Sequence, residues 1–484
     1  MPGSDDRSRQ RHWCKQRGHR EHPRTQRGRR LAGKGGQTLW PGCMMKRLLF
    51  LAHYFPPIGG AGVQRSVKFV KHLPAFGIEP IIFTGPSEAQ GRWQPEDASL
   101  DSELPPGLEV HRIQGSPPTQ TTRASRLLGT TSPFGKWLSE GLLRLSETLD
   151  AAPDVLLVSL APYEALAPAL SMARKWGCPI VADLRDPWAL DEVRIYPSSW
   201  HRQREQAQMQ RLLGQCDAVI WNCPEAHAAG RDLLGEAGSQ RQHCIPNGYD
   251  EDDFAGLRPR APDGRLRIVH SGYLHAELGL RHRARGRLQR LLGGELSPVD
   301  FLTRSHVFLL KALERLQREQ PQLAGSIDLH LYGVLSPSDT RIAQESSFKS
   351  IHLHGYTPHS GLVRALVESD ILFLPMHDLT QGRRARIVPG KTYEYLRAGA
   401  PILAAVPPGD ARDFVIAAEA GHCVPPAGSD EMVDAIASAA EKPEKRSSPV
   451  REAIARFERR RLTAELASIL DQVLGGSSPI TPRI

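Results

Sequence analysis

The sequence predicts an α/β protein built from two doubly wound units, each a parallel sheet flanked by helices. From residue 45 onward, short apolar runs alternate with amphipathic helical patterns, which is typical of parallel sheets. The alternation restarts after residue 245. The chain of 484 residues is also longer than one hydrophobic core usually supports. These observations together indicate two domains.

The first unit begins with the run "RLLFLA" and a glycine turn, "HYFPPIGGAG". The helix after the turn places Val63, Val67 and Val70 on one face, and Gly77 is expected to end it. Further helices are expected near 163–176 and 199–214, and residues 86–150 are less regular. The predicted strands are 47–52, 79–85, 155–160, 179–184 and 217–222.

The second unit repeats this pattern, and Ser429 with the acids after it predicts a capped helix start. An arginine-rich stretch, 276–298, is interpreted as an inserted surface loop or helix, and 451–474 as one amphipathic helix. The predicted strands are 267–274, 327–333, 351–355, 370–376 and 400–406. The predicted helices are 303–319, 359–369, 391–398, 410–420 and 430–441.

The patterns divide the chain into four segments. They are a disordered basic extension at 1–44, an N-terminal domain at 45–245, a C-terminal domain at 246–445, and a terminal segment at 446–484 whose helix is expected to pack back on the N-terminal domain. Residues 1–44 carry eleven Lys or Arg and three Asp or Glu, without hydrophobic periodicity. We expect translation to begin at Met44 or Met45. A basic arm for nucleic acid or an anionic membrane is the alternative.

Charge and cysteine usage favour a cytoplasmic protein without a nucleic-acid partner. Residues 45–484 contain 51 basic and 50 acidic side chains, so the body of the protein is nearly neutral. The seven cysteines show no C-x-x-C spacing, which predicts reduced, mostly buried thiols and no zinc site. No apolar run approaches 18 residues, so no membrane span is expected.

Two segments have the character of a ligand site. The turn "GGAG" (59–62) matches neither the dinucleotide fingerprint nor the nucleoside triphosphate loop, but it separates a strand from a helix, where an anion or a closely approaching ligand can lie. Tight packing of helix on sheet explains it equally well. In the second unit a helix begins at Gly390, with Lys391 and Glu394 in its first turn. That arrangement suits a phosphate at the helix end and a carboxylate for ribose hydroxyls, and a solvated first turn is the alternative.

The run "PGKTYEYLRAGAPILA" resembles the nucleotide-sugar-binding motif of family 4-type, group 1 glycosyltransferases with the GT-B fold. That fold consists of two Rossmann-like domains facing across a cleft. Other landmarks of the family have similar counterparts here in the same order, and the resemblance covers about residues 46–442: "HYFPPIGGAGVQR", "VADLRDPW", "IPNGYD", "HSGYL" and "HGYTPHSGLVRALVESDILFLPM".

The resemblance implies a retaining, metal-independent, hexosyl-type glycosyltransferase without a cofactor. The donor would be a UDP- or GDP-linked sugar on the C-terminal domain, and the acceptor a saccharide or lipid-linked hydroxyl on the N-terminal one. Such enzymes act in polysaccharide or cell-envelope biosynthesis.

Residue by residue, the resemblance places Glu394 on the ribose and Gly390 and Lys391 beside the diphosphate. The turn glycines Gly59, Gly60 and Gly62 would face the cleft from the other domain. Asp186, with Arg185 beside it, is the candidate for an acceptor-side or catalytic role, and a structural salt bridge at the sheet edge is the alternative.

Some residues depart from the family pattern. An E-x7-E pair would put a glutamate at position 386, where this chain has Arg386, so the sugar is in doubt. Arg386 and its neighbours Arg383 and Arg384 are candidates for phosphate contacts, against a solvated basic loop. An Arg/Lys pair is missing after "HSGYL", and Lys311 is the candidate substitute.

Other functions stay open on the sequence. Asp250 and Asp252 of "YDEDDF" form a D-x-D, but they are interpreted as exposed linker or helix-cap groups rather than as metal ligands. A GT-B nucleotide-sugar epimerase and a non-catalytic nucleotide-sugar-binding scaffold are the alternatives to a transferase. Arginines at 281–290 predict a peripheral contact with an anionic membrane, at its inner face, or only a solvated loop.

Overall fold

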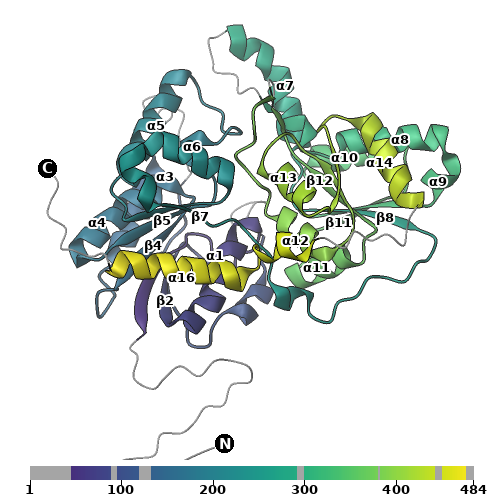
Figure 1. Cartoon of the computed structure of the whole chain (residues 1–484). Coiled ribbons are helices and arrows are strands. Elements are labelled where there is room, and N and C mark those ends of the chain that lie inside the picture. Colours follow the sequence, from purple (N-terminus) through teal and green to yellow (C-terminus); the bar gives the residue numbers. More distant parts are fainter. Residues whose placement is uncertain are drawn as a thin grey trace, which may run out of the picture. The chain divides into compact units, whose positions relative to one another are not determined.

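The computed structural model describes residues 45–88, 95–118, 132–291, 299–379, 382–441 and 450–475. Within these ranges the chain forms two parallel sheets, each flanked by helices (Figure 1). The predicted α/β fold class of two doubly wound units is therefore confirmed. The predicted extension at 1–44 lies outside the described residues.

The first sheet has seven strands among the described residues, in the order β3-β2-β1-β4-β5-β6-β7. The order reverses between β1 and β4, which pair in parallel with Leu48 beside Val155. Such a reversal opens a crevice at the carboxyl ends of the strands. The strands are β1 (Lys46–Leu51), β2 (Ile78–Thr84), β3 (Glu109–Arg112), β4 (Val155–Leu160), β5 (Ile180–Leu184), β6 (Ala218–Trp221) and β7 (Gln242–Cys244).

The helices around this sheet begin directly after the glycine turn. Gly77, with φ of 76°, closes the segment that starts with α1, as predicted. The sequence patterns did not reveal β3 and β7, because β3 is half exposed and β7 has only three residues. The helices are α1 (Ala61–His72), α3 (Pro133–Leu145), α4 (Leu166–Trp176), α5 (Ser199–Leu213) and α6 (Pro224–Leu234).

The second sheet has six strands among the described residues, in the order β11-β10-β8-β12-β14-β15, and its order reverses between β8 and β12. The edge strand β15 was not predicted, since its "GHCV" residues are largely exposed. The strands are β8 (Leu266–Ser271), β10 (Ile327–Tyr332), β11 (Ile351–Gly355), β12 (Ile371–Pro375), β14 (Ile402–Ala405) and β15 (Gly421–Val424), with β9 (Val299–Asp300) and β13 (Asp378–Leu379) in a separate antiparallel pair.

Residues 276–291 of the arginine-rich stretch form helix α7, and two of the arginines are ion-paired, Arg281 with Glu277 and Arg283 with Asp300. At the start of α14, the Ser429 hydroxyl donates to the carbonyl of Phe308. The helices are α7 (Ala276–Leu291), α8 (Val307–Glu319), α9 (Pro321–Gly325), α10 (Pro337–Glu345), α11 (His359–Val367), α12 (Lys391–Ala398), α13 (Asp410–Ala417) and α14 (Ser429–Glu441).

The prediction of one continuous helix over 451–474 is wrong. The structure has α15 (Arg451–Ala455) and α16 (Arg459–Gly475), separated by a short break. Phe457 in the break is 2% exposed, and its carbonyl accepts the N–H of Tyr249, while the N–H of Arg459 donates to the carbonyl of Tyr249. Tertiary contacts therefore override the helical pattern.

Helix α16 packs against α1, with which it shares an apolar cluster (Figure 1). Leu462, Leu466 and Leu470 are almost fully buried in that cluster. The ammonium of Lys46 on β1 lies 2.6 Å from the carboxylate of Asp471. The C-terminal helix is thus in direct contact with elements of the first sheet.

The prediction that Asp250 is an exposed linker group is wrong, although its helix-cap role is confirmed. Asp250 is 2% exposed, and its carboxylate accepts from the N–H of Asp252 at the start of the 3₁₀ turn Glu251–Phe254. Its other oxygen lies 2.8 Å from the Lys71 ammonium and 3.2 Å from that of Lys68. A buried carboxylate needs such cations because it has lost its hydration.

The described cysteines are free thiols, of which Cys178, Cys216 and Cys223 are buried. Cys14 and Cys43 fall outside the described ranges. Across the helices of those ranges, none combines the length and the apolar character that a membrane span requires.

Candidate active site

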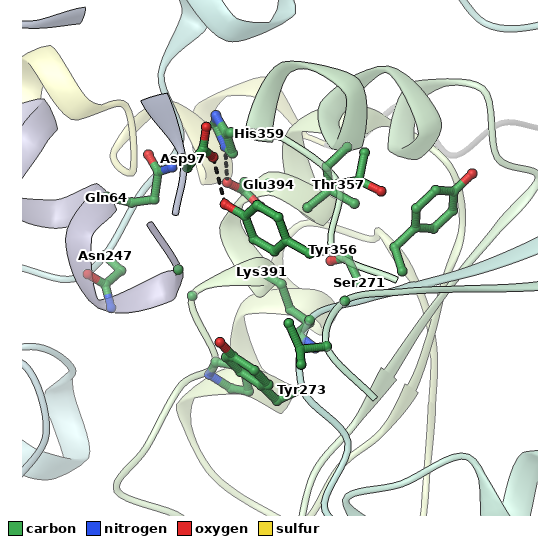
Figure 2. A pocket seen from close by; sticks show the side chains of 18 of the residues that line it. Gln64, Asp97, Asn247, Ser271, Tyr273, Tyr356, Thr357, His359, Lys391 and Glu394 are labelled. Carbon is green, nitrogen blue, oxygen red and sulfur yellow. Dashed lines mark hydrogen bonds and ion pairs between the residues drawn. The ribbon is translucent and has the colours of Figure 1, made fainter. Parts of the chain in front are cut away.

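A cavity of about 220 Å³ lies where carboxyl ends of strands from both sheets converge. The first half contributes Gly60, in the turn between β1 and α1, and the second half contributes Ser271 at the end of β8, with Gly272 and Gly333 directly after β8 and β10. Ligands of doubly wound sheets bind in crevices of this kind. Its other lining residues include Gln64, Asp97, Asn247, Tyr273, His275, Arg304, Tyr332, Tyr356, Thr357, His359, Gly390, Lys391, Glu394 and Arg459 (Figure 2).

Helix α12 directs its N-terminus at the cavity. Its N-cap is Gly390, which has no side chain to bond the first N–H groups. The N–H groups of Thr392 and Tyr393 donate to the carbonyls of Pro389 and Gly390, which leaves the N–H of Lys391 for a ligand. Tyr395 in the same helix accepts a 2.8 Å hydrogen bond from the N–H of Ser271 with its hydroxyl. Because Tyr395 is fully buried, this bond fixes α12 against the end of β8.

Lys391 is surrounded by groups that orient its ammonium without neutralising it. Its Nζ donates to Nε2 of His270 at 3.3 Å, while Nδ1 of His270 donates to the carbonyl of Phe373 at 3.1 Å. Burial, and then the charge of Arg304, hold the pKa of Lys391 well below its usual value. A Cβ on Gly272, where φ is +91°, would lie 3.1 Å from the same Nζ, so a larger residue would crowd the lysine.

Glu394 lies one turn further along α12 and is held in position by a histidine. Nε2 of His359 donates to Glu394 Oε1 at 2.9 Å (Figure 2). Burial alone would lower the pKa of His359, but the hydrogen bond and charge of Glu394 outweigh it, and the pKa is raised above 6.5. Nδ1 of His359 lies 3.9 Å from the carboxylate of Asp253, which in turn lies 2.7 Å from the ammonium of Lys68 on α1, in the first half of the chain.

The opposite wall of the cavity is polar and tightly packed. The Tyr356 hydroxyl donates to Asp97 Oδ2 at 2.7 Å, and Gln64 and Asn247 lie on the same side of the view as Asp97 (Figure 2). A Cβ on Gly59 would lie 2.7 Å from the Tyr356 hydroxyl. The turn after β1 therefore approaches the second half of the chain closely at Gly59.

Four of the residues singled out on the sequence line this one cavity. They are Gly60, Gly390, Lys391 and Glu394. The glycine turn and the start of α12, more than three hundred positions apart, thus share one space.

Gly59, Gly62, Arg185 and Asp186 are not among the lining residues. A Cβ on Gly62 would lie 2.9 Å from Nη1 of Arg185, so this glycine makes room for that guanidinium. Burial lowers the pKa of Arg304, and the negative charge of Asp186 partly opposes this shift. Asp186 therefore acts on the cavity through a longer-range electrostatic interaction.

The basic loop before α12 points elsewhere. Arg386 donates its N–H to Glu192 Oε1 at 2.9 Å and its Nη1 to the carbonyl of Leu190 at 3.4 Å, both in the first half of the chain. Arg384 forms ion pairs with Glu225 and Asp413. Neither arginine is among the lining residues.

Lys311 is exposed, with its ammonium 5.0 Å from the centre of the Phe308 ring, and is not among the lining residues. The cation near Lys391 is instead Arg304. Sequence reasoning missed Arg304 because helix α7 separates it from β8, so no fixed spacing indicated it. It also missed Arg459, which stands in the charged run "ERRR" and resembles part of a solvated face.

Two domain models match the chain. Residues 59–248 match the glycosyl transferase 4-like domain, and residues 300–442 match the glycosyl transferases group 1 domain. The chain belongs to the GT-B glycosyltransferases of the family 4 type. No curated protein matches the sequence significantly.

The folds of several solved glycosyltransferase structures are similar to the fold of this chain. Anabaena Alr3699/HepE in complex with UDP and glucose has 16% identity and a TM-score of 0.54, covering 88% of this chain and 100% of its own. A trehalose-6-phosphate protein from E. coli bound with UDP-2-fluoro glucose has 15% identity and a TM-score of 0.53, covering 90% and 100%. The apo lipopolysaccharide outer core galactosyltransferase WaaB has 12% identity and a TM-score of 0.51, covering 88% and 99%.

Proposed function

We propose that this glycosyltransferase moves a hexosyl group from a UDP- or GDP-linked donor to a hydroxyl of a saccharide or lipid-linked acceptor, with retention of anomeric configuration. The supporting observation is that Gly60 and the N-terminus of α12, with Lys391 and Glu394, line a single cavity. A uridine donor is favoured because two similar structures contain UDP or a UDP-sugar.

In this proposal the donor diphosphate lies at the start of α12. The N–H groups at Gly390 and the ammonium of Lys391 would bind its oxygens, and Arg304 would add a second cation. Glu394, oriented by His359, would accept from the ribose hydroxyls. Gly60 would face the diphosphate from the first half of the chain, while Gly59 and Gly62 allow that close approach.

Catalysis would depend on stabilising the leaving group. As the bond between the anomeric carbon and the phosphate oxygen breaks, negative charge grows on the diphosphate, and the preorganised cations and helix N–H groups stabilise it. The acceptor oxygen would then bond the anomeric carbon on the face that the diphosphate leaves, and its proton would pass to the departing phosphate oxygen. Lys391 and Arg304 would provide the positive charge that other transferases take from a metal ion.

The acceptor side is assigned to the first half of the chain, over residues 45–245, and the donor side to 246–445. We propose that Asp186 and Arg185 contact the acceptor, or contact neighbouring acidic residues that orient the acceptor. Asp191 belongs to the same group of acids, because burial, followed by the charges of Asp186 and Glu192, raises its pKa to about 7. A peripheral contact of α7 with anionic lipid remains part of the proposal.

Binding of nucleoside diphosphates tests the proposal. We expect UDP or GDP to raise the melting temperature of residues 45–484, because a ligand of the native state stabilises it by mass action. Glu394→Ala should lose most of that shift, since one partner of the ribose is removed, while Glu441→Ala at the end of α14 should retain it. An equal shift in Glu394→Ala would remove the ribose assignment.

Product analysis separates the remaining functions. Transfer to an acceptor supports the proposal, whereas free nucleotide released together with an epimerised sugar, without any acceptor, identifies an epimerase. Binding without turnover on any acceptor identifies a scaffold.

A further inference from the structure

Arg459, at the start of the C-terminal helix α16, lies in the cavity wall although it comes from neither of the two matched domains. Arg459 is 4% exposed. Nη1 of its guanidinium is buried and has no hydrogen-bond partner among the described residues. Burial, followed by the charge of Arg65, lowers the pKa of Arg459 to about 10, so the side chain is still a cation at neutral pH.

The neighbouring arginine shows how a purely structural cation is satisfied in this protein. Arg65 on α1 is 2% exposed, and its guanidinium donates to both oxygens of Asp183 and to the carbonyl of Pro246. Arg459 has no such partners in the described structure, which is costly for a buried charge.

The two carboxylates whose charges raise the pKa of Arg459, and the carboxylate of the preceding residue, are each engaged by another group. Glu394 Oε1 accepts from His359, and Asp250 accepts from Lys71 and from the N–H of Asp252. Glu458, the preceding residue, accepts from two N–H groups in the first turn of α16. The negative charges of these acids favour the Arg459 cation, but none of the acids accepts a hydrogen bond from its buried Nη1.

The start of α1 adds a second feature to the same cavity. Its N-cap is Gly60, with φ of 95°, and the helix has neither a capping side chain nor an acid in its first turn. Gln64, one turn along, also lines the cavity. A helix N-terminus without an acid attracts anions, and Arg459 supplies the matching full charge.

We propose that Arg459 is a substrate-binding residue that, with the N-terminus of α1, receives an anionic group of the ligand through phosphate or carboxylate oxygens. The inference rests on the proposed transferase function, because the cavity is the one assigned there to the donor. The anion comes either from the donor diphosphate or from an acidic group on the acceptor or the transferred sugar. The C-terminal segment is then part of the binding site as well as of the fold.

The test compares Arg459→Gln with Arg460→Gln, an exposed arginine of the same turn. Both variants keep the backbone N–H groups that α16 uses, and melting temperature is measured with UDP, with uridine, and with inorganic phosphate added to UDP-saturated protein. Arg459→Gln should melt at the wild-type temperature or above without ligand, since an unpaired buried charge is removed. A residue that only maintains the fold would instead lower the melting temperature when replaced.

The ligand arms identify the source of the anion. If Arg459→Gln weakens UDP about tenfold or more and leaves uridine unchanged, the group is the donor diphosphate. If UDP is unchanged but the further shift with phosphate disappears, the group belongs to the acceptor or sugar. Arg459→Lys should restore part of either response, and Arg460→Gln should match the wild type.

Two results would overturn the inference: equal responses of Arg459→Gln and wild type to both anions, or a loss of uridine binding in parallel with a lower melting temperature. Failure of the proposed function has a different signature. In that case wild-type protein does not respond to UDP, yet phosphate still stabilises it through Arg459.

Discussion

At the scale of single residues, the lysine at the start of α12 has the most direct electrostatic consequence. Lys391 contacts a neutral histidine at 3.3 Å, and Arg304 adds a like charge, so its pKa lies well below the usual value. A diphosphate placed beside it would favour the ammonium form. Binding would therefore raise the pKa of Lys391 and take up protons.

We expect the affinity for UDP to fall as the pH rises through the lowered pKa of Lys391. Above about pH 7 the phosphates of UDP are already ionised, so they do not contribute to this fall. The affinity is full where the free protein already holds the proton, and it declines as the pH rises above the lowered pKa. Calorimetry in buffers of different ionisation enthalpy measures the proton uptake directly.

Lys391→Met serves as the comparison for that experiment. The variant should bind UDP about tenfold or more weakly, because a charge-assisted hydrogen bond is lost, and it should lack the proton uptake that the wild type shows on binding. Binding by the wild type without proton uptake would show that the diphosphate does not contact Lys391.

The sequence was informative about residues that follow local rules. Gly390, Lys391 and Glu394 could be identified because the beginning of a helix after Pro-Gly concentrates N–H groups, a cation and a carboxylate within one turn. Arg304 and Arg459 could not, because only folding across an inserted helix and back from the C-terminus brings them to the cavity. Arg386, singled out for its charge, instead donates to carboxylate and carbonyl groups of the first half.

At the scale of elements, the position of α12 depends on a buried hydroxyl. Tyr395 is fully buried and accepts the N–H of Ser271 at 2.8 Å, with the Ser271 hydroxyl 3.2 Å away. The bond connects the helix that carries Gly390 and Lys391 to the end of β8. The geometry of the cavity therefore depends on it.

Tyr395→Phe should lower the free energy of unfolding by about 1–3 kcal/mol, because the buried N–H of Ser271 loses its acceptor. UDP binding should weaken as well, since α12 is less firmly placed. Ser271→Ala retains the N–H and should cost less on both counts. Urea denaturation of the two variants measures the difference, and equal losses would contradict this assignment.

The elements that the sequence revealed are those whose burial is continuous. Strand β4, buried along its whole length, coincides with its predicted range of 155–160. Strands β3, β7 and β15 are short or half exposed, so no apolar run marks them. The break between α15 and α16 depends on contacts of Phe457 with Tyr249, which no local pattern contains.

At the scale of the whole molecule, each of the two parallel sheets reverses its strand order once, next to β1 in the first sheet and next to β8 in the second. The segments that follow β1 and β8 meet at the cavity. This convergence of Gly60 and Gly390 is what joins two weak sequence signals into one site. Helix α16 then adds Arg459 to the same wall while its apolar face packs against α1. Fold and site thus share the C-terminal segment.

A crystal structure of the protein with UDP is the most direct test of the site. We predict diphosphate oxygens within hydrogen-bond distance of the Lys391 N–H at the start of α12 and of Lys391 Nζ, with Gly60 on the opposite side of the ligand. UDP bound outside this cavity, or bound with its diphosphate directed away from α12, would contradict the proposal.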